Sequence, residues 1–157
     1  MPAGAAQNLK VVAHRVDGSL IKGFTDGIPQ FYRDSLIKQA PAAPPEKLRL
    51  RLAESNKDTD IRIDDLKALF FVKSFAGTDG YSEIKFFKAH PLMEGLWVRL
   101  KFADQESTEG VIYNSMHFLT SPGFFLKPPD PQSNNEMVYV LKKSLTDFRI
   151  LGVRNSY

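Results

Sequence analysis

A spacing that occurs twice limits the folds open to this sequence. Near the start of each half, similar residues lie 87 positions apart in the sequence. Val11, Asp17 and Gly23 of the first half recur as Val98, Asp104 and Gly110 of the second. Later in each half, similar residues lie 79 positions apart. Apolar residues at Ile61, Leu66, Leu69 and Phe71 correspond to Val140, Leu145, Phe148 and Ile150. The two separations predict a small, bent antiparallel sheet of about five strands in each half. The alternative interpretation is chance similarity between two β-rich segments.

The individual strands are predicted from alternation and from turn residues. Residues 47–52 alternate leucine with lysine or arginine, a period of two that places the leucines on one face of a strand. Asp17-Gly18 separates two short apolar runs, which predicts a two-residue hairpin turn. The second half has Asp104-Gln105 at that point and therefore lacks the preferred turn glycine. Helical signals are weak. Residues 64–69 and 143–148 could each form one helical turn instead of a strand, and residues 81–88 could form a short helix or a strand.

The chain has 157 residues, 43% of them hydrophobic and 25% charged, which suits one domain or two very small ones. We divide it into a flexible N-terminus (1–8), a first β-barrel-like repeat (9–75), a connector (76–94) and a second β-barrel-like repeat (95–153). Each repeat would bury only a modest core alone, so the two are expected to pack through the phenylalanine-rich middle of the chain. The predicted fold is mainly β, with two related small antiparallel barrels in tandem and little helix.

The glycine that follows each aspartate turn resembles the bending glycine of Sm-like and SH3-like small β-barrels. The second half contains GFFLKPPDPQSNNEMVYV, which is similar to an uncharacterised bacterial family with the core G-[FW]-F-L-x-P-x-D-x-x-S-N-N-x-x-[VI]-[FY]-V. This likeness spans residues 96–152, with a weaker version over 9–75. It implies a small bacterial β-barrel protein and brings no known activity.

The polar loop inside that core is the first candidate site. Its prolines favour extended backbone, while Asp130, Ser133, Asn134 and Asn135 are residues whose side chains bond to nearby backbone groups. They therefore predict either a loop held in one shape or a contact surface for a partner. A site for a hard cation is the third interpretation, although the loop offers one carboxylate and no glycine.

Basic strand residues form the alternative site, of the RNA-binding or nucleotide-binding kind. The candidates are Arg49, Arg51, Arg99 and Lys101, with His117 and Phe118 as aromatic neighbours. Outward cations also keep a small barrel soluble, which is the competing interpretation. The segment DGSLIKG resembles the second motif of PilZ-like cyclic-dinucleotide receptors but is one residue too long, and no R-x-x-x-R precedes it.

Several classes of chemistry lack a sequence signal. The chain has no cysteine, no G-x-S-x-G or H-E-x-x-H motif and no glycine-rich phosphate loop. Its 21 basic and 18 acidic residues are intermixed, and no apolar run is long enough to span a bilayer. We therefore expect a cytoplasmic, non-catalytic interaction or adaptor module that binds a protein partner, without cofactor, metal or membrane, and with RNA or a cyclic dinucleotide as the alternative ligand.

Overall fold

The computed structural model describes residues 8–36, 44–77, 81, 83–88 and 95–154, and the side chains of residues 116, 117 and 154 are not described. Most of the expected flexible N-terminus (1–8) and part of the expected connector (76–94) therefore lie outside the described residues. Within the described residues the fold is mainly β, with antiparallel strands and only two short α-helices. The prediction of a mainly β chain with little helix is confirmed.

The elements of each half follow one order, namely two strands, a helix, two strands, a 3₁₀ turn and a final strand. In the first half they are β1 (Lys10–Arg15), β2 (Leu20–Thr25), α1 (Gln30–Leu36), β3 (Lys47–Leu52), β4 (Asp58–Arg62), η1 (Ile63–Asp65) and β5 (Leu66–Val72). In the second half they are β6 (Gly95–Phe102), β7 (Ser107–Ile112), α2 (Met116–Thr120), β8 (Gly123–Leu126), β9 (Asn135–Leu141), η2 (Lys142–Ser144) and β10 (Leu145–Arg154).

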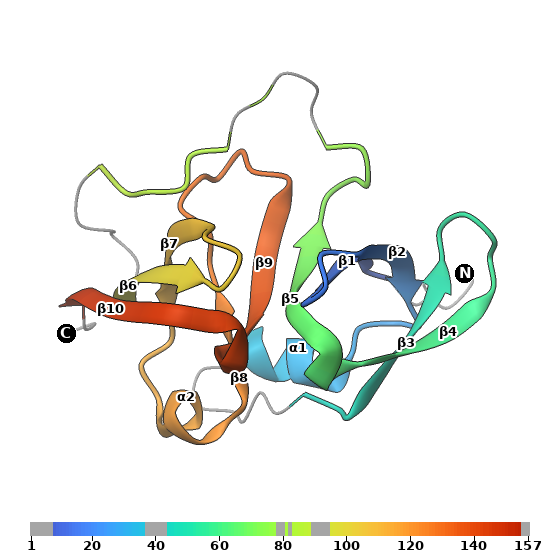
Figure 1. Ribbon diagram of the computed structural model, residues 1–157, viewed down its shortest axis with the longest axis horizontal. Helices are drawn as coiled ribbons and strands as arrows, with labels where there is room; N and C mark the ends of the chain where they lie inside the picture. The colour runs from blue at the N-terminus through green and yellow to red at the C-terminus, as the bar shows by residue number, and fades with distance from the viewer. Residues whose placement is uncertain (1–7, 37–43, 78–80, 82, 89–94, 155–157) are drawn as a thin grey trace, which may run out of the picture.

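The strands form two antiparallel sheets, of order β4-β3-β2-β1-β5-β9-β8 and β10-β6-β7. A single bridge between Val111 of β7 and Lys127, just after β8, connects them. The strands of the described residues thus form one line from β4 to β10, and they do not close into a barrel. Figure 1 shows β5 and β9 side by side in the middle, where backbone pairing joins the two halves.

The pairing registers of the two halves carry the separations of 87 and 79 residues seen in the sequence, and β3 and β8 add a third separation of 76 residues. Corresponding pairs are Val11–Gly23 and Val98–Gly110, Ala13–Leu69 and Leu100–Phe148, Phe24–Arg51 and Val111–Lys127, and Leu48–Ile61 and Phe124–Val140. We call two residues counterparts when they take the same place in these pairings. The term compares positions in the two halves, and the side chains at those positions often differ.

A glycine sits at the same crowded place in both halves. A Cβ on Gly23 would lie 2.8 Å from the carbonyl oxygen of Arg51, and a Cβ on Gly110 would lie 2.8 Å from the carbonyl oxygen of Lys127. Carbon and oxygen atoms do not approach so closely without displacement, so only glycine fits where the second and third strands of each half cross. The turn positions also correspond, because Gly18 has φ +91° and Gln105 has φ +76°.

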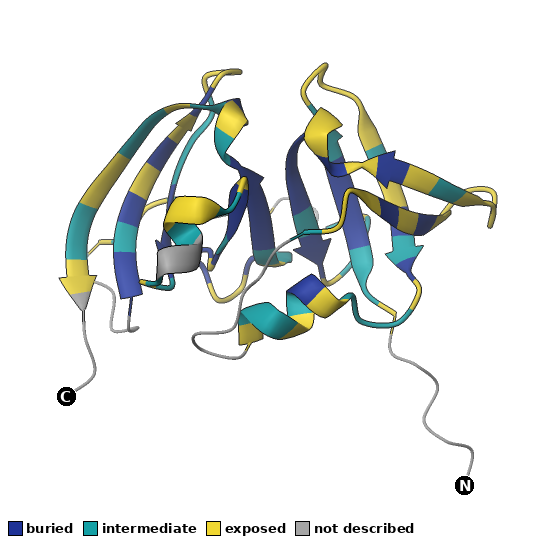
Figure 2. Ribbon diagram, turned by 90° about the horizontal axis from the view of Figure 1, so that it is seen from below, coloured by how far each residue is buried: buried dark blue, intermediate teal, exposed yellow. Residues whose placement is uncertain are grey.

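Two hydrophobic cores lie on either side of the central strands (Figure 2). β5 and β9 contribute to both, with Leu69, Phe71 and Tyr139 in the first core and Ala68 and Val140 in the second. Alternation along a strand explains this division, since successive side chains point to opposite faces. Of the phenylalanine-rich middle, Phe70 and Phe71 lie on β5, and the junction of the halves is the pairing of this strand with β9.

Candidate functional site

The polar loop expected to be a site joins β8 to β9, and its aspartate is buried. The Asp130 carboxylate accepts hydrogen bonds from the Tyr81 hydroxyl, from the backbone N–H of Ile84 at 3.1 Å and from that of Gln132 at 2.9 Å. The Tyr81 bond is the main reason that the pKa of Asp130 is lowered, and the same bond raises the pKa of Tyr81 to about 12. Asp130 thus anchors the segment that follows β5.

The other three loop candidates bond to the same segment. Ser133 donates to Glu83 at 2.6 Å, and the Asn135 amide donates to the other oxygen of Glu83 at 3.4 Å. The Asn134 side chain accepts from the backbone N–H of Ser74 at 2.9 Å and donates to the Ser74 carbonyl at 2.7 Å. These internal contacts support the interpretation of a loop held in one shape. Partner binding by these four residues stays a prediction.

The four basic candidates lie on two different sheets, with Arg49 and Arg51 on β3 and Arg99 and Lys101 on β6. Figures 1 and 2 both place β3 and β6 on opposite sides of the molecule. Because phosphate binding along a strand face needs neighbouring cations, this separation does not favour a shared nucleic-acid surface.

Acidic side chains also accompany these cations. Arg49 is paired with Asp60 at 3.0 Å, and Arg99 lies 3.4 Å from the buried Glu109. The hollow beside Arg51 is lined by Asp26 and Asp58 as well. Such acidic neighbours repel phosphate, which weakens the case for RNA or cyclic-dinucleotide binding at these positions. His117 has no described side chain, and Phe118 lines an apolar groove beside β10.

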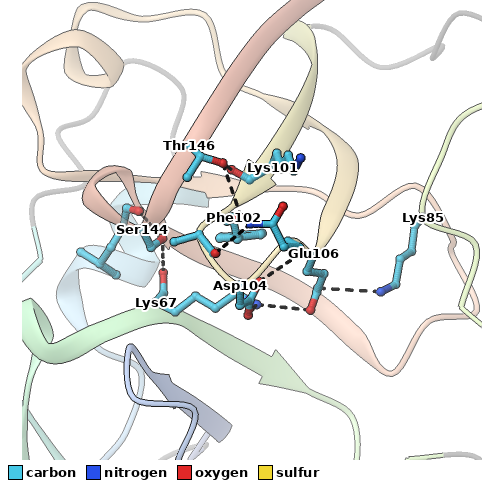
Figure 3. A network of polar contacts seen from close by, with 11 residues as sticks. Lys67, Lys85, Lys101, Phe102, Asp104, Glu106, Ser144 and Thr146 are labelled. Carbon is cyan, nitrogen blue, oxygen red and sulfur yellow. Dashed lines mark hydrogen bonds and ion pairs between the residues drawn. The ribbon is translucent and has the colours of Figure 1, made fainter.

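A buried lysine between the halves is part of a second polar network (Figure 3). The Lys67 ammonium on β5 donates to Asp104 at 2.6 Å and to Glu106 at 3.2 Å, and lies 4.4 Å from the centroid of the Phe102 ring. The bond to Lys67 is the main reason that the pKa of Asp104 is lowered. Lys67 therefore holds the β6–β7 turn, whose Gln105 has the positive φ for which glycine is preferred.

The outer edge of β10 was not identified from the sequence. Within the described residues β10 pairs with β6 on one side, and no strand pairs with its other side. A groove of about 330 Å³ beside β10 is lined by Phe118, Phe124, Phe148, Leu145 and Lys142, among others. Free backbone groups and apolar side chains thus lie together, which is the combination that an added strand requires.

Two exposed apolar side chains belong to the same two elements, α2 and β10. Leu119 of α2 and Ile150 of β10 have exposed fractions of 67% and 54%, which is high for large aliphatic residues. Phe118 stacks on Phe148 with ring centroids 5.2 Å apart, so α2 lies against β10. We call the surface formed by Phe118, Leu119, Phe148 and Ile150 the open apolar face.

The corresponding surface of the first half is covered. Phe31 and Tyr32 of α1 follow Gly23 at the spacing with which Phe118 and Leu119 follow Gly110. Likewise, Leu69 and Phe71 of β5 are the counterparts of Phe148 and Ile150. Unlike Ile150, Phe71 is only 2% exposed, as is Phe31.

The covering residues come from the second half. The Phe31 ring lies 5.4 Å from Tyr139 and 5.5 Å from Phe125, and the Tyr32 ring lies 5.8 Å from Phe125. Phe125 on β8 and Tyr139 on β9 are a cross-strand pair. Strand β9 therefore supplies both the backbone partner of β5 and part of the cover for the first core. No described strand does this for β10.

Membrane-spanning segments and metal sites are two further kinds of functional feature. No helix of the described residues has the length and apolar character needed to cross a membrane. In the same residues, no three His, Asp or Glu side chains are grouped so that they could hold a metal ion.

Comparison with known protein families gave a match over nearly the whole chain. The family model, described as a family of unknown function, DUF6982, covers residues 7–152. No curated protein and no solved structure matches the chain.

Proposed function

We infer the function from the geometry of the structure, because the chain belongs to DUF6982, a family of unknown function. We propose that the protein is a non-catalytic interaction module. In this proposal an extended segment of another protein pairs with the outer edge of β10 and covers the open apolar face. The observation that carries it is the contrast between β5, whose edge is paired with β9, and β10, whose edge is unpaired in the described residues.

The proposal includes an interpretation of the fold. We propose that the two halves are related five-stranded units of the Sm-like and SH3-like kind, arranged in tandem. The strand orders β4-β3-β2-β1-β5 and β9-β8-β7-β6-β10, the second of which includes the Val111–Lys127 bridge, support this interpretation. The two separate cores support it as well. On this interpretation the first unit already holds a strand, and the second has the equivalent position open.

A panning experiment with random dodecapeptides tests the function. Peptides selected on the wild-type protein should bind the Leu119→Asp, Ile150→Arg double variant about tenfold or more weakly, because both changes place charge on the open apolar face. Both side chains are exposed, so the variant should fold, which circular dichroism checks. Asp58→Lys on the opposite outer edge, β4, is the matched control and should leave binding unchanged. Failure to select any binder, or binding insensitive to the double variant, would contradict the proposal.

A further inference from the structure

The pairing of β5 with β9 shows how this protein holds a strand, and it is a template for what β10 can accept. The two strands are antiparallel, and Phe71, Phe70 and Leu69 lie opposite Met137, Val138 and Tyr139. Met137 and Tyr139 point to the first core, whereas Val138 points to the second. Strand β9, the strand that β5 holds, is therefore apolar on both faces, because both of its faces are buried.

Strand β10 offers the same backbone arrangement with different chemistry on one face. Phe148, which lines the groove, replaces Leu69, and Ile150, two residues further along the same face of β10, replaces Phe71, so that face still calls for large apolar side chains. Asp147, which also borders the groove, and Arg149 alternate with these side chains and stand where β5 has Ala68 and Phe70. Their side chains are 45% and 67% exposed and form an ion pair with each other at 2.9 Å. These two positions therefore call for charged side chains.

We propose, on the basis of the proposed function, that the strand bound by β10 runs antiparallel to it with the pattern large apolar, acidic, aromatic, basic, large apolar. The aromatic residue lies opposite Phe148 and beside Phe118, as Tyr139 lies opposite Leu69 and beside Phe31. The acidic residue lies opposite Arg149 and the basic residue opposite Asp147, because opposite charges on facing positions of an antiparallel pair attract. The first large apolar residue lies opposite Ile150.

The outer edge β4 of a second copy does not fit this pattern. Where Phe125 and Tyr139 form a ring pair with centroids 4.9 Å apart, the first half has the ion pair of Arg49 and Asp60 at 3.0 Å. In the template register β4 would place Asp60 opposite Phe148. Burying that carboxylate against an aromatic ring is unfavourable, and charged edges of this kind oppose strand pairing.

The β10 edge of a second copy does not fit either. In the first half, α1 contacts rings on β5, β8 and β9, so the helix extends below the strand that is added to β5. By the same arrangement α2 extends below the strand added to β10. Two copies paired through β10 would bring both α2 helices to one place. The ligand is therefore a strand of a different protein, without a helix on its groove side.

Fluorescence anisotropy with designed peptides tests the pattern. The probe is a dye-labelled peptide of about eleven residues with the centre Met-Glu-Tyr-Lys-Leu and Gly/Ser flanks, and the comparison peptide has the centre Met-Lys-Tyr-Glu-Leu. The wild-type protein should prefer the first by about fivefold or more, since two facing charge pairs change from attractive to repulsive. The Asp147→Arg, Arg149→Asp double variant should show the reverse preference, and it keeps an ion pair between the same two positions.

The direction of the bound strand is tested by a nitroxide on the N-terminus of the first peptide. It should broaden the amide NMR signals near Ile150 more than those near Leu145 if the strands are antiparallel. Lack of binding by either peptide, a preference that does not reverse in the double variant, or the opposite broadening would overturn the inference. The function itself would still be supported if panning selects peptides that depend on Leu119 and Ile150, so the two failures can be distinguished.

Discussion

The two halves of the molecule place their strands in the same registers but use opposite chemistry at one position. The third and fourth strands of the first half carry Arg49 and Asp60 on their outer face, and those of the second half carry Phe125 and Tyr139 there. The charged pair remains at the surface, whereas the aromatic pair covers the core of the other half. Two residues per half thus decide which edge is buried and which stays exposed, while the backbone arrangement is shared.

Replacement of Tyr139 by Ala should cause the largest loss of stability. Tyr139 is fully buried between β5 and α1, so its truncation should lower the free energy of unfolding by about 3–5 kcal/mol, as large-to-small core changes do. Asp60→Ala at the counterpart position should cause little change, since that side chain is exposed. Urea unfolding monitored by circular dichroism measures both.

A second variant at the same position checks the reason. Tyr139→Phe should keep the wild-type stability, because the buried Tyr139 hydroxyl has no hydrogen-bond partner among the described residues. If Tyr139→Ala and Asp60→Ala had equal effects, the contrast between the covered and the exposed half would be refuted.

The two bending glycines should give the next largest effects, and similar ones. Gly23→Ala and Gly110→Ala each place a Cβ about 2.8 Å from a backbone oxygen, which forces the crossing strands apart and should cost about 2–3 kcal/mol. Gly27→Ala is the matched control, because its Cβ meets nothing within 4 Å and only its φ of +69° opposes the change. A large effect at one glycine with none at the other, in the same unfolding assay, would show that the two crossings are not equivalent.

Removal of the carboxylates around Lys67 should have a smaller effect. The Asp104→Asn, Glu106→Gln double variant leaves a buried ammonium without its anions and should cost about 1–3 kcal/mol, less than in a fully buried pair because both carboxylates are partly exposed. Lys67→Met removes the charge at similar volume and should be nearly neutral. Thermal unfolding of both variants checks this order.

The first half supplies the control for that prediction. Asp17 is the counterpart of Asp104, yet its carboxylate accepts from the N–H and hydroxyl of Ser19, and Gly18 takes the positive φ without strain. Asp17→Asn should therefore change stability less than the double variant does. An equal loss would mean that Lys67 does not stabilise the second turn.

Much of the strand arrangement follows from residues that are visible in the sequence. The Asp17-Gly18 turn and the leucine alternation of β3 predicted the first hairpin and an amphipathic strand, and both are present. The predicted two-residue turn is wrong, because the Arg15 N–H donates to the Ser19 carbonyl and the loop between them has three residues. The short helices were not predicted, because α1 and α2 have seven and five residues and cannot show a clear helical period. Because α2 was not predicted, the open apolar face, to which α2 contributes Phe118 and Leu119, was not predicted either.

The pairing of β5 with β9 was also missed, although a signal existed. LKALFFV and MVYVL are apolar at nearly every position, which is typical of strands buried on both faces, whereas KLRLRL is apolar at every second position. Such runs indicate central strands but do not identify the partner strand. Which strand pairs with β5 depends on the side chains that meet on both faces of the sheet. These side chains come together only when the two cores have formed.

The smallest expected effect concerns pH and again separates the halves. Burial, and secondarily the charge of Lys67, lower the pKa of His14 on β1, with Glu106 and Asp104 acting in the opposite direction. Because the folded protein then binds a proton less readily than the unfolded chain, stability is complete above the ordinary histidine pKa of about 6.5 and falls as pH decreases below it. Asp104, whose pKa is also lowered, adds a further loss below about pH 4.

Urea midpoints between pH 8 and pH 3 measure this dependence. His14→Gln should abolish the decline that begins near pH 6.5 and keep the one below about pH 4. Asp104→Asn should keep the decline near pH 6.5 and only lessen the one below about pH 4, because the pKa of Asp130 is lowered as well. Lys101 is the counterpart of His14 in the second half and is exposed on β6, so Lys101→Gln is the matched control and should leave the profile unchanged in shape. A decline that persists in His14→Gln would place the titrating group elsewhere, and the pH response would then no longer distinguish the first half from the second.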